Sequence, residues 1–215
     1  MLDKWVFIGR IIHILCGFTA LSTGLIIILI KKGTSTHKIL GKTFLLALFT
    51  TCTFSLLLQI NRYFDAILAY QAVLGIYLGI SGFFDFNRYF TQNIRKSFQL
   101  ILPAITFCFC IFLLFLSYNG KINKNPTLIL ASISGGFIFS IVDIALQLRF
   151  VFSNKTRTHY LLPHAIKLIT AFIVMLSAFS STTFNFLETP YKETWPSFIG
   201  LPILYFWAIR KLQRK

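Results

Sequence analysis

The chain has 215 residues, of which 56% are apolar, 17% aromatic and only 13% charged. A soluble domain carries about 25% charged residues, so this composition excludes an ordinary soluble protein. The formal net charge is +15, but the basic residues lie in short segments between apolar blocks, which excludes nucleic acid as a partner. We therefore expect an integral membrane protein whose principal partner is the lipid bilayer.

Seven apolar blocks of membrane-spanning length follow one another along the chain. They cover approximately residues 5–30, 43–60, 66–84, 98–118, 127–150, 164–186 and 197–210. A helix needs about 20 apolar residues to cross the bilayer core, and these blocks are too long and too uniformly apolar for barrel strands. The sequence predicts one all-α domain over residues 1–215, built as a bundle of about seven transmembrane helices.

The distribution of lysine and arginine predicts how this bundle is oriented. The segments after the first, third and fifth blocks, the C-terminus and the block ends that adjoin them hold 15 of these residues, and the opposite side holds 6. Cytoplasmic segments of membrane proteins carry an excess of lysine and arginine. We therefore expect the N-terminus outside and the C-terminus in the cytoplasm.

Small and polar residues spaced about four apart mark the faces on which the helices should pack. Such seams occur in three blocks, as Gly9, His13, Gly17, Ala20 and Gly24, as Gln71, Gly75 and Gly79 with Gly82 close by, and as Ser132, Gly136, Ser140 and Asp143. Small residues let helix backbones approach closely in lipid, so we expect the polar residues on these seams to face the bundle. The fourth block has no such seam and contains Pro103, which predicts a kinked, peripheral helix.

His13 lies inside an apolar block, where an ionisable residue is costly and calls for an explanation. It lies about 12 Å into its helix, in an outer polar layer with Arg10 and Gln71. His37 lies in the basic segment 31–42, at the inner face. The two histidines are therefore expected at opposite depths, where one ion cannot use both.

The inner polar layer begins at two predicted helix starts. Thr34, Ser35 or Thr36 can cap the second helix, which places His37 in its first turn. Pro163 suits the first position of the sixth helix, which places His164 directly after it. Both imidazoles are then available for a metal, a haem or an anionic head group.

Asp143 and Lys167 are the expected ion pair of this inner layer. Asp143 lies about two turns above the inner face, and Lys167 has a long stem that can reach it. The pair predicts either a structural clamp between helices or part of a polar path, because intramembrane ionisable residues serve both purposes.

Several short motifs resemble those of a known bacterial family. They are His13-Ile14-x-x-Gly17-Phe18-x-Ala20-Leu21-x-x-Gly24, Lys32-Gly33-x-x-x-His37-Lys38-x-x-Gly41-Lys42, His164-x-x-Lys167-x-x-x-Ala171-Phe172, Ser177-Ala178-Phe179 and Trp195-Pro196-x-x-x-Gly200-x-Pro202. With these motifs the chain resembles, over nearly its whole length, the multi-pass membrane proteins of domain-of-unknown-function family 2306. The resemblance implies a bacterial inner-membrane location and keeps His13, His37 and His164 together as a set, but it implies no activity. The chain departs from the family pattern at Lys167 and Ser177.

Two functional hypotheses start from ionisable residues inside the apolar blocks. The first is a haem-associated redox protein, because histidines on helices can serve as axial haem ligands; its cofactor-binding residues would be His13, His37 and His164. The second is a small transporter, channel or sensor; its polar clamp or path would comprise Arg10, Gln71, Asp143 and Lys167.

A third hypothesis is a metal-dependent enzyme that modifies lipid at the inner face. The metal would be held by His37, His159 and His164, although the chain has no His-x-x-x-His pair. The pair Lys31-Lys32 is interpreted first as a topology anchor. Contact with anionic lipid head groups at the cytoplasmic face is a further expectation for these two lysines.

Overall fold

A computed structural model of the chain describes residues 2–60, 65–87, 95–119, 133, 136, 140–145, 158–188 and 191–213. The helices are α1 (Leu2–Leu29), α2 (Ser35–Ile60), α3 (Ala66–Asn87), α4 (Arg95–Tyr118), α6 (Thr158–Thr183) and α7 (Tyr191–Gln213). Residues 140–145 are also helical, and none of the described residues lies in a strand. The all-helical architecture predicted from the sequence is therefore confirmed for this part of the chain.

Four of the described helices are long and apolar enough to cross a membrane. The candidate spans are Lys4–Leu29, Ser35–Ile60, Ala66–Asp85 and Leu162–Thr183, and α4 contains a shorter apolar stretch, Ile101–Leu116. Large apolar side chains such as Phe7, Leu15 and Phe18 are exposed on the outer face of α1, as expected for a surface in contact with lipid. The predicted fifth span, 127–150, lies mostly outside the described residues.

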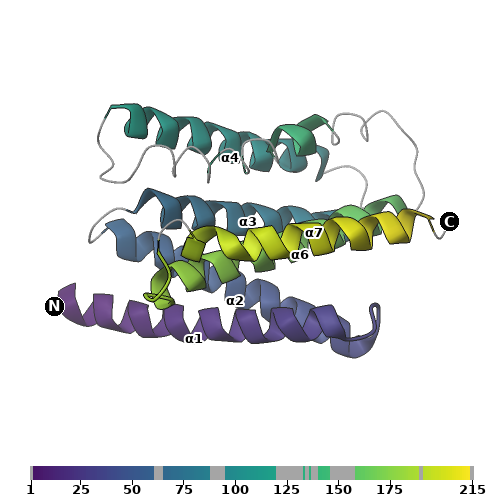
Figure 1. Cartoon of the computed structure of the whole chain (residues 1–215), viewed down its shortest axis with the longest axis horizontal. Helices are drawn as coiled ribbons and strands as arrows, with labels where there is room; N and C mark the ends of the chain where they lie inside the picture. Colours follow the sequence, from purple (N-terminus) through teal and green to yellow (C-terminus); the bar gives the residue numbers. More distant parts are fainter. Residues whose placement is uncertain are drawn as a thin grey trace.

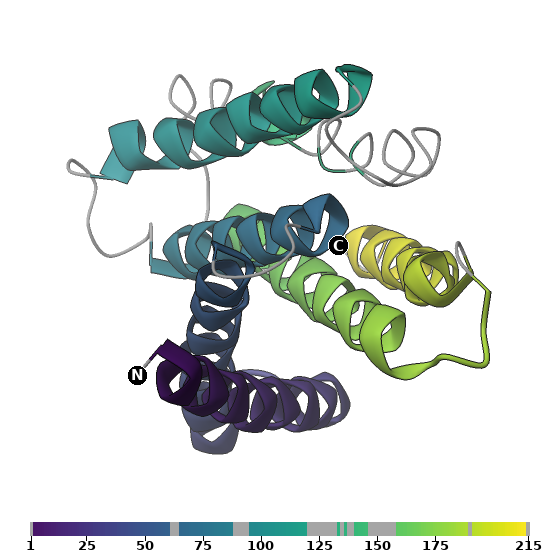
Figure 2. The ribbon, with the colours of Figure 1, turned by 90° about the vertical axis from the view of Figure 1, so that its left-hand side faces the viewer.

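α3 is the central helix of the bundle. α2, α4 and α6 all pack against it, while α1 packs along α2 and α7 packs along α6. Figure 2 shows α4 as the outermost helix on its side of α3, which agrees with the peripheral position predicted for it. The N- and C-termini lie at opposite ends of the long axis (Figure 1).

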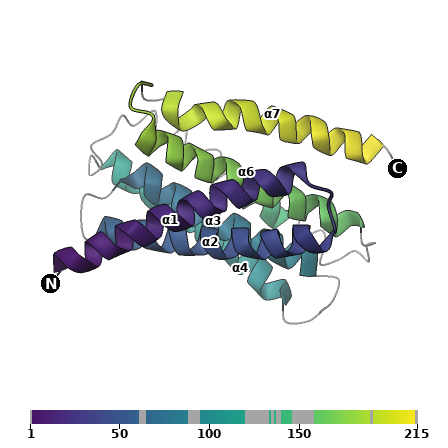
Figure 3. The same cartoon turned by 90° about the horizontal axis from the view of Figure 1, so that it is seen from below.

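The small-residue seams lie at helix contacts, as predicted. A Cβ atom added to Gly79 would lie 2.8 Å from Leu48 Cδ2, and one added to Gly75 would lie 3.1 Å from Cys52 Sγ. These glycines therefore let α3 approach α2 closely. Gly24 does the same for α1 and α6, because its Cβ would lie 2.5 Å from a ring carbon of Phe172. Figure 3 shows α1 running across α2 and α6.

The turn between α1 and α2 contains the predicted helix cap. Gly33 takes a positive φ of 86°, and Thr34 Oγ1 accepts the backbone N–H of His37 at 3.2 Å. The ammonium group of Lys32 donates to the carbonyl of Ile28 at 2.8 Å and so satisfies the last turn of α1. Helix α2 begins at Ser35 with His37 in its first turn, as predicted, eight residues before the apolar block that starts at residue 43.

The predicted start of α6 is wrong, and α7 begins before its apolar block. Helix α6 begins at Thr158, so Pro163 lies inside it rather than at its first position. Helix α7 begins at Tyr191 rather than at residue 197. The physical reason is that apolar blocks mark the part of a helix that lies in hydrocarbon, whereas the backbone stays helical through the polar turns that precede it.

Two hydrogen bonds tie α7 to α6. Ser177 Oγ donates to the carbonyl of Glu193 at 2.7 Å, and the indole N–H of Trp195 donates to Ser180 Oγ at 2.6 Å. The second and third of the C-terminal motifs quoted above, at residues 177–179 and 195–202, are therefore neighbours in space.

Candidate functional site

α3 carries a row of buried polar side chains on the face that is turned away from α2. Tyr77, Ser81 and Asp85 are spaced four residues apart, so they lie above one another on one face of the helix. Each of the three is at most 2% exposed. Gly75 and Gly79, which contact α2, lie about 200° around the helix axis from Tyr77 and Ser81. The polar row therefore lies on the other side of α3, where α6 packs.

α6 approaches the polar row closely because α3 has a glycine at position 82. A Cβ atom at Gly82 would lie 3.2 Å from Lys167 Cβ and 3.1 Å from Leu168 Cδ2. On α6, His164 and Lys167 are three residues apart and therefore share one face. The sequence of both helices thus directs the imidazole and the ammonium group toward α3.

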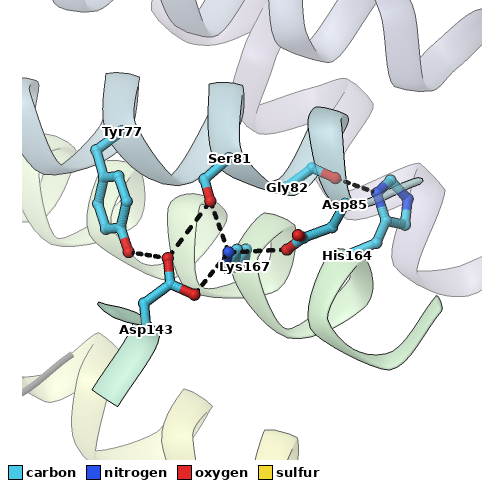
Figure 4. Close-up of polar contacts among 7 residues, drawn as sticks. All are labelled: Tyr77, Ser81, Gly82, Asp85, Asp143, His164 and Lys167. Atoms are coloured by element: carbon cyan, nitrogen blue, oxygen red, sulfur yellow. Dashed lines mark hydrogen bonds and ion pairs between the residues drawn. The ribbon is translucent and has the colours of Figure 1, made fainter. Parts of the chain in front are cut away.

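Lys167 joins the two helices to the helical residues 140–145. Its Nζ lies 2.8 Å from Asp85 Oδ2 and 2.9 Å from Asp143 Oδ1, and it donates to Ser81 Oγ at 2.6 Å. Three side-chain oxygen atoms of these residues thus lie within 3 Å of the ammonium nitrogen. Figure 4 shows the ammonium between the two carboxylates. The ion pair predicted between Asp143 and Lys167 is confirmed.

The second carboxylate oxygen of Asp143 is also hydrogen-bonded. Asp143 Oδ2 accepts the hydroxyl of Tyr77 and, at 3.5 Å, the hydroxyl of Ser81. We call the five residues Tyr77, Ser81, Asp85, Asp143 and Lys167 the ionic cluster.

The ionic cluster holds more negative than positive formal charge. Asp85, Asp143 and Lys167 are 2%, 4% and 3% exposed, so all three charges are removed from water. Two carboxylates and one ammonium sum to a charge of −1, and burying a net charge costs several kcal/mol. One added proton makes the group neutral.

His164 lies beside this cluster in a fixed tautomer. Its Nδ1 is 2.7 Å from the carbonyl oxygen of Gly82, and a carbonyl only accepts, so Nδ1 carries a hydrogen. The other ring nitrogen, Nε2, is therefore the atom that gains or loses a proton. Asp85 is near enough to act electrostatically on the imidazole.

His37 lies at the same end of the bundle as His164. Phe44 of α2 and Phe172 of α6 both contact the position of Gly24. His37 precedes Phe44 by seven residues and His164 precedes Phe172 by eight, and α2 and α6 both start at the end that holds the α1–α2 turn (Figure 1). The two imidazoles are near enough to interact electrostatically, in line with the predicted inner layer.

His13 lies far from both of these histidines. Its Nδ1 is 3.0 Å from the carbonyl oxygen of Thr51, which accepts a hydrogen bond from the ring. Thr51 is fourteen residues beyond His37 on α2, a distance of about 21 Å along the helix. His13, His37 and His164 therefore do not converge on one haem or one metal ion.

Two members of the predicted polar path are not part of the ionic cluster. Arg10 is exposed on α1. Gln71 lies about 21 Å along α3 from Asp85, and its Oε1 is buried without a hydrogen-bond partner within the described residues. Of the four path residues, the structure thus brings together only Asp143 and Lys167.

Within the described residues, no group of three or more His, Cys, Asp or Glu side chains could hold a metal ion. His159 lies on α6, but its side chain is outside the described part. The metal site formed by His37, His159 and His164 therefore stays a prediction.

Three members of the ionic cluster were missed as site residues by the sequence analysis. They are Tyr77, Ser81 and Asp85. The signal that could have found them is their spacing of four, on the face of α3 opposite its glycine seam. Tyrosine and serine are ordinary residues in membrane helices, so only the carboxylate at the end of the row marks it as unusual.

Comparisons with protein-family models, with curated proteins and with solved structures give no match. The function is therefore inferred from the geometry of the ionic cluster.

Proposed function

We propose that this protein is a membrane transport protein that conducts protons, and that the ionic cluster binds and releases one proton. The observation that carries the proposal is the pair of buried carboxylates, 2.8 and 2.9 Å from a single ammonium group. Within the ionic cluster, two acidic side chains and one basic side chain carry formal charge.

The surplus carboxylate distinguishes a proton site from a purely structural clamp. A clamp between two helices needs one acid and one base, because a second buried acid adds a desolvation cost. When two carboxylates share one site, one of them holds its proton more tightly than an isolated acid does. Ionisable groups kept in this way inside a membrane commonly mark proton or ion pathways.

The position of the cluster suits exchange with water at one end of the bundle. Asp85 is the last residue of the candidate span Ala66–Asp85, and Lys167 lies five residues into the span Leu162–Thr183, about 8 Å deep. Tyr77 lies about 12 Å farther along α3 than Asp85. The residues of the ionic cluster therefore extend from Asp85, at one end of its candidate span, to Tyr77, deeper in the bundle.

We also propose the topology and location that the sequence predicts. Seven spans, an external N-terminus and a cytoplasmic C-terminus follow from the apolar blocks and the basic segments. The bacterial inner membrane and membership of family 2306 rest on the resemblance of the motifs. The cluster would then lie near the cytoplasmic face.

The proposal is tested by proton flux in reconstituted vesicles. The full chain is placed in liposomes that contain a pH-sensitive dye, and a potassium gradient with valinomycin drives protons inward. The wild type should acidify the interior, and Asp143→Asn should slow this at least about tenfold, because it removes the surplus carboxylate. Glu188→Gln is the matched control, since Glu188 is exposed in the α6–α7 connection.

Equal flux in the wild type and Asp143→Asn, at equal amounts of folded protein, would contradict the proposal. So would a wild-type rate no higher than that of empty liposomes.

A further inference from the structure

We infer that the turn after α6, residues 184–187, is an aromatic anchor whose partner is the head-group region of the lipid bilayer, at the face opposite the ionic cluster. Phe184 lies about 26 Å along α6 from Lys167. Figure 3 shows the α6–α7 connection and the α1–α2 turn at opposite ends of the bundle. The inference goes beyond the proposed function and does not depend on it.

The first argument is that the chain turns while it is still apolar. Helix α6 ends at Thr183, which is also the end of the candidate span Leu162–Thr183. The next four residues read Phe-Asn-Phe-Leu, whereas a connection that lies in water is expected to be polar. Large apolar side chains therefore begin directly beyond the span, where the lipid already lies beside the chain.

The second argument is that the backbone of the anchor has its own hydrogen-bond partners. The N–H of Phe184 donates to the carbonyl of Ser180 at 3.0 Å. The N–H of Asn185 donates to Thr183 at 3.0 Å, and that of Leu187 donates to Phe184 at 3.2 Å. Backbone groups that leave water need partners inside the protein, so these contacts allow the turn to lie against lipid.

The third argument is that an aromatic cluster joins the anchor to both helices. The ring centroid of Phe184 lies 6.3 Å from that of Trp195 on α7, with 14° between the ring planes, and 6.1 Å from that of Phe179 on α6. The indole N–H of Trp195 donates to Ser180 Oγ at 2.6 Å. The third neighbour, Phe186, has its centroid 5.3 Å from that of Phe184. The anchor therefore has a fixed support.

The fourth argument is the mixture of side chains that the anchor exposes. Phe186 is 79% exposed, and its polar neighbours Asn185 and Glu188 are exposed as well. A ring left in water gains nothing from the hydrophobic effect, whereas insertion beside acyl chains removes its surface from water. Polar side chains next to phenylalanine and leucine suit the boundary between head groups and acyl chains.

The test is fluorescence quenching of Phe186→Trp in phosphatidylcholine vesicles, after subtraction of the signal of the wild type with its three tryptophans. Lipids brominated on the acyl carbons next to the head group should quench the added signal, and lipids brominated near the bilayer centre should quench it less. Glu188→Trp is the matched control, since Glu188 is exposed in the same connection. Water-soluble acrylamide should quench this control at least about twofold more than Phe186→Trp.

Equal quenching of the two variants by acrylamide would overturn the inference, because the ring would then lie in water. Protection from acrylamide without quenching by either brominated lipid would also overturn it. In that case protein, for example a second copy of the chain, would cover the ring.

Thermal unfolding in the same vesicles is a second measurement that needs no added tryptophan. Phe186→Ser should lower the melting temperature by about 2 °C or more, because the ring loses its contact with lipid. A substitution of a side chain that lies in water changes stability little, so Asn185→Ser is the control and should leave the melting temperature unchanged. Equal melting temperatures for Phe186→Ser and the wild type would overturn the anchor.

Discussion

Lys167 is the residue on which the ionic cluster depends. Its Nζ lies within 3 Å of oxygen atoms of Ser81, Asp85 and Asp143. The ammonium is therefore the positive charge that lies between the two acids of the cluster. Removing the base and removing one acid should therefore have unequal effects on stability.

Lys167→Met should destabilise the fold much more than Asp143→Asn. The first change leaves two buried carboxylates without their cation, which costs about 3–5 kcal/mol. The second leaves the neutral pair of Lys167 and Asp85 and costs about 1–2 kcal/mol in lost hydrogen bonds. Thermal unfolding in detergent measures both, and an equal or smaller loss for Lys167→Met would contradict the charge count.

Tyr77→Phe should weaken the cluster without changing its formal charge. The phenol hydroxyl donates to Asp143, and its loss leaves a buried acceptor with one donor fewer, at a cost of about 1–3 kcal/mol. Tyr191→Phe is the control, because Tyr191 is exposed at the start of α7. Similar free energies of unfolding for the two variants would show that the Tyr77 hydroxyl is not held as described.

The sequence predicts part of this site at the residue scale. Asp143 and Lys167 could be paired because both are ionisable residues near one end of their apolar blocks. Asp85 was not predicted as a partner of Lys167, because its contact depends on which face of α3 meets α6. That choice is made by the tertiary packing at Gly82, which no periodicity within one helix reveals.

At the scale of the elements, the contact between α3 and α6 positions the site. The contact is close because Gly82 has no side chain to separate Lys167 Cβ from the α3 backbone. The glycine seams predicted this kind of packing correctly. The cap at Thr34 was predicted correctly, but the start of α6 was not, because Pro163 lies inside that helix rather than at its first position.

Gly82→Ala should loosen the cluster by pushing α6 away. The added methyl would lie 3.1 Å from Leu168 Cδ2 and 3.2 Å from Lys167 Cβ. Helix α6 must therefore move away from α3 by a few tenths of an ångström. We expect a lower melting temperature and a slower proton flux. A higher melting temperature together with unchanged flux would contradict the account.

Gly41→Ala is the matched control for that substitution. Nothing lies within 4 Å of a Cβ at Gly41, which is also a helical glycine in a candidate span. Alanine favours a helix over glycine by about 1 kcal/mol, so this variant should keep or raise the melting temperature.

At the scale of the whole molecule, the two termini lie at opposite ends of the long axis (Figure 1). The α1–α2 turn, the C-terminal end of α3 and the start of α6 meet at the end where the C-terminus lies. Of the 21 lysines and arginines, 15 belong to the segments predicted for that side. The proposed orientation thus places the ionic cluster near the cytoplasm.

Reporter fusions test this orientation. A fluorescent protein that matures only in the cytoplasm should be active at the C-terminus, and a phosphatase that is active only outside should report from the N-terminus. Both reporters on the same side of the membrane would contradict the proposed odd number of spans.

The surplus proton of the ionic cluster can be measured directly. Ordinary carboxyl groups titrate near pH 4 and lysines near pH 10. The four histidines exchange protons between about pH 8 and about pH 6, but they are present in both the wild type and Asp143→Asn, so the difference between the two proteins reports the cluster. The measurement is the number of protons taken up per chain by the wild type and by Asp143→Asn. The wild type should take up about one proton more, and equal uptake would contradict a proton-binding cluster.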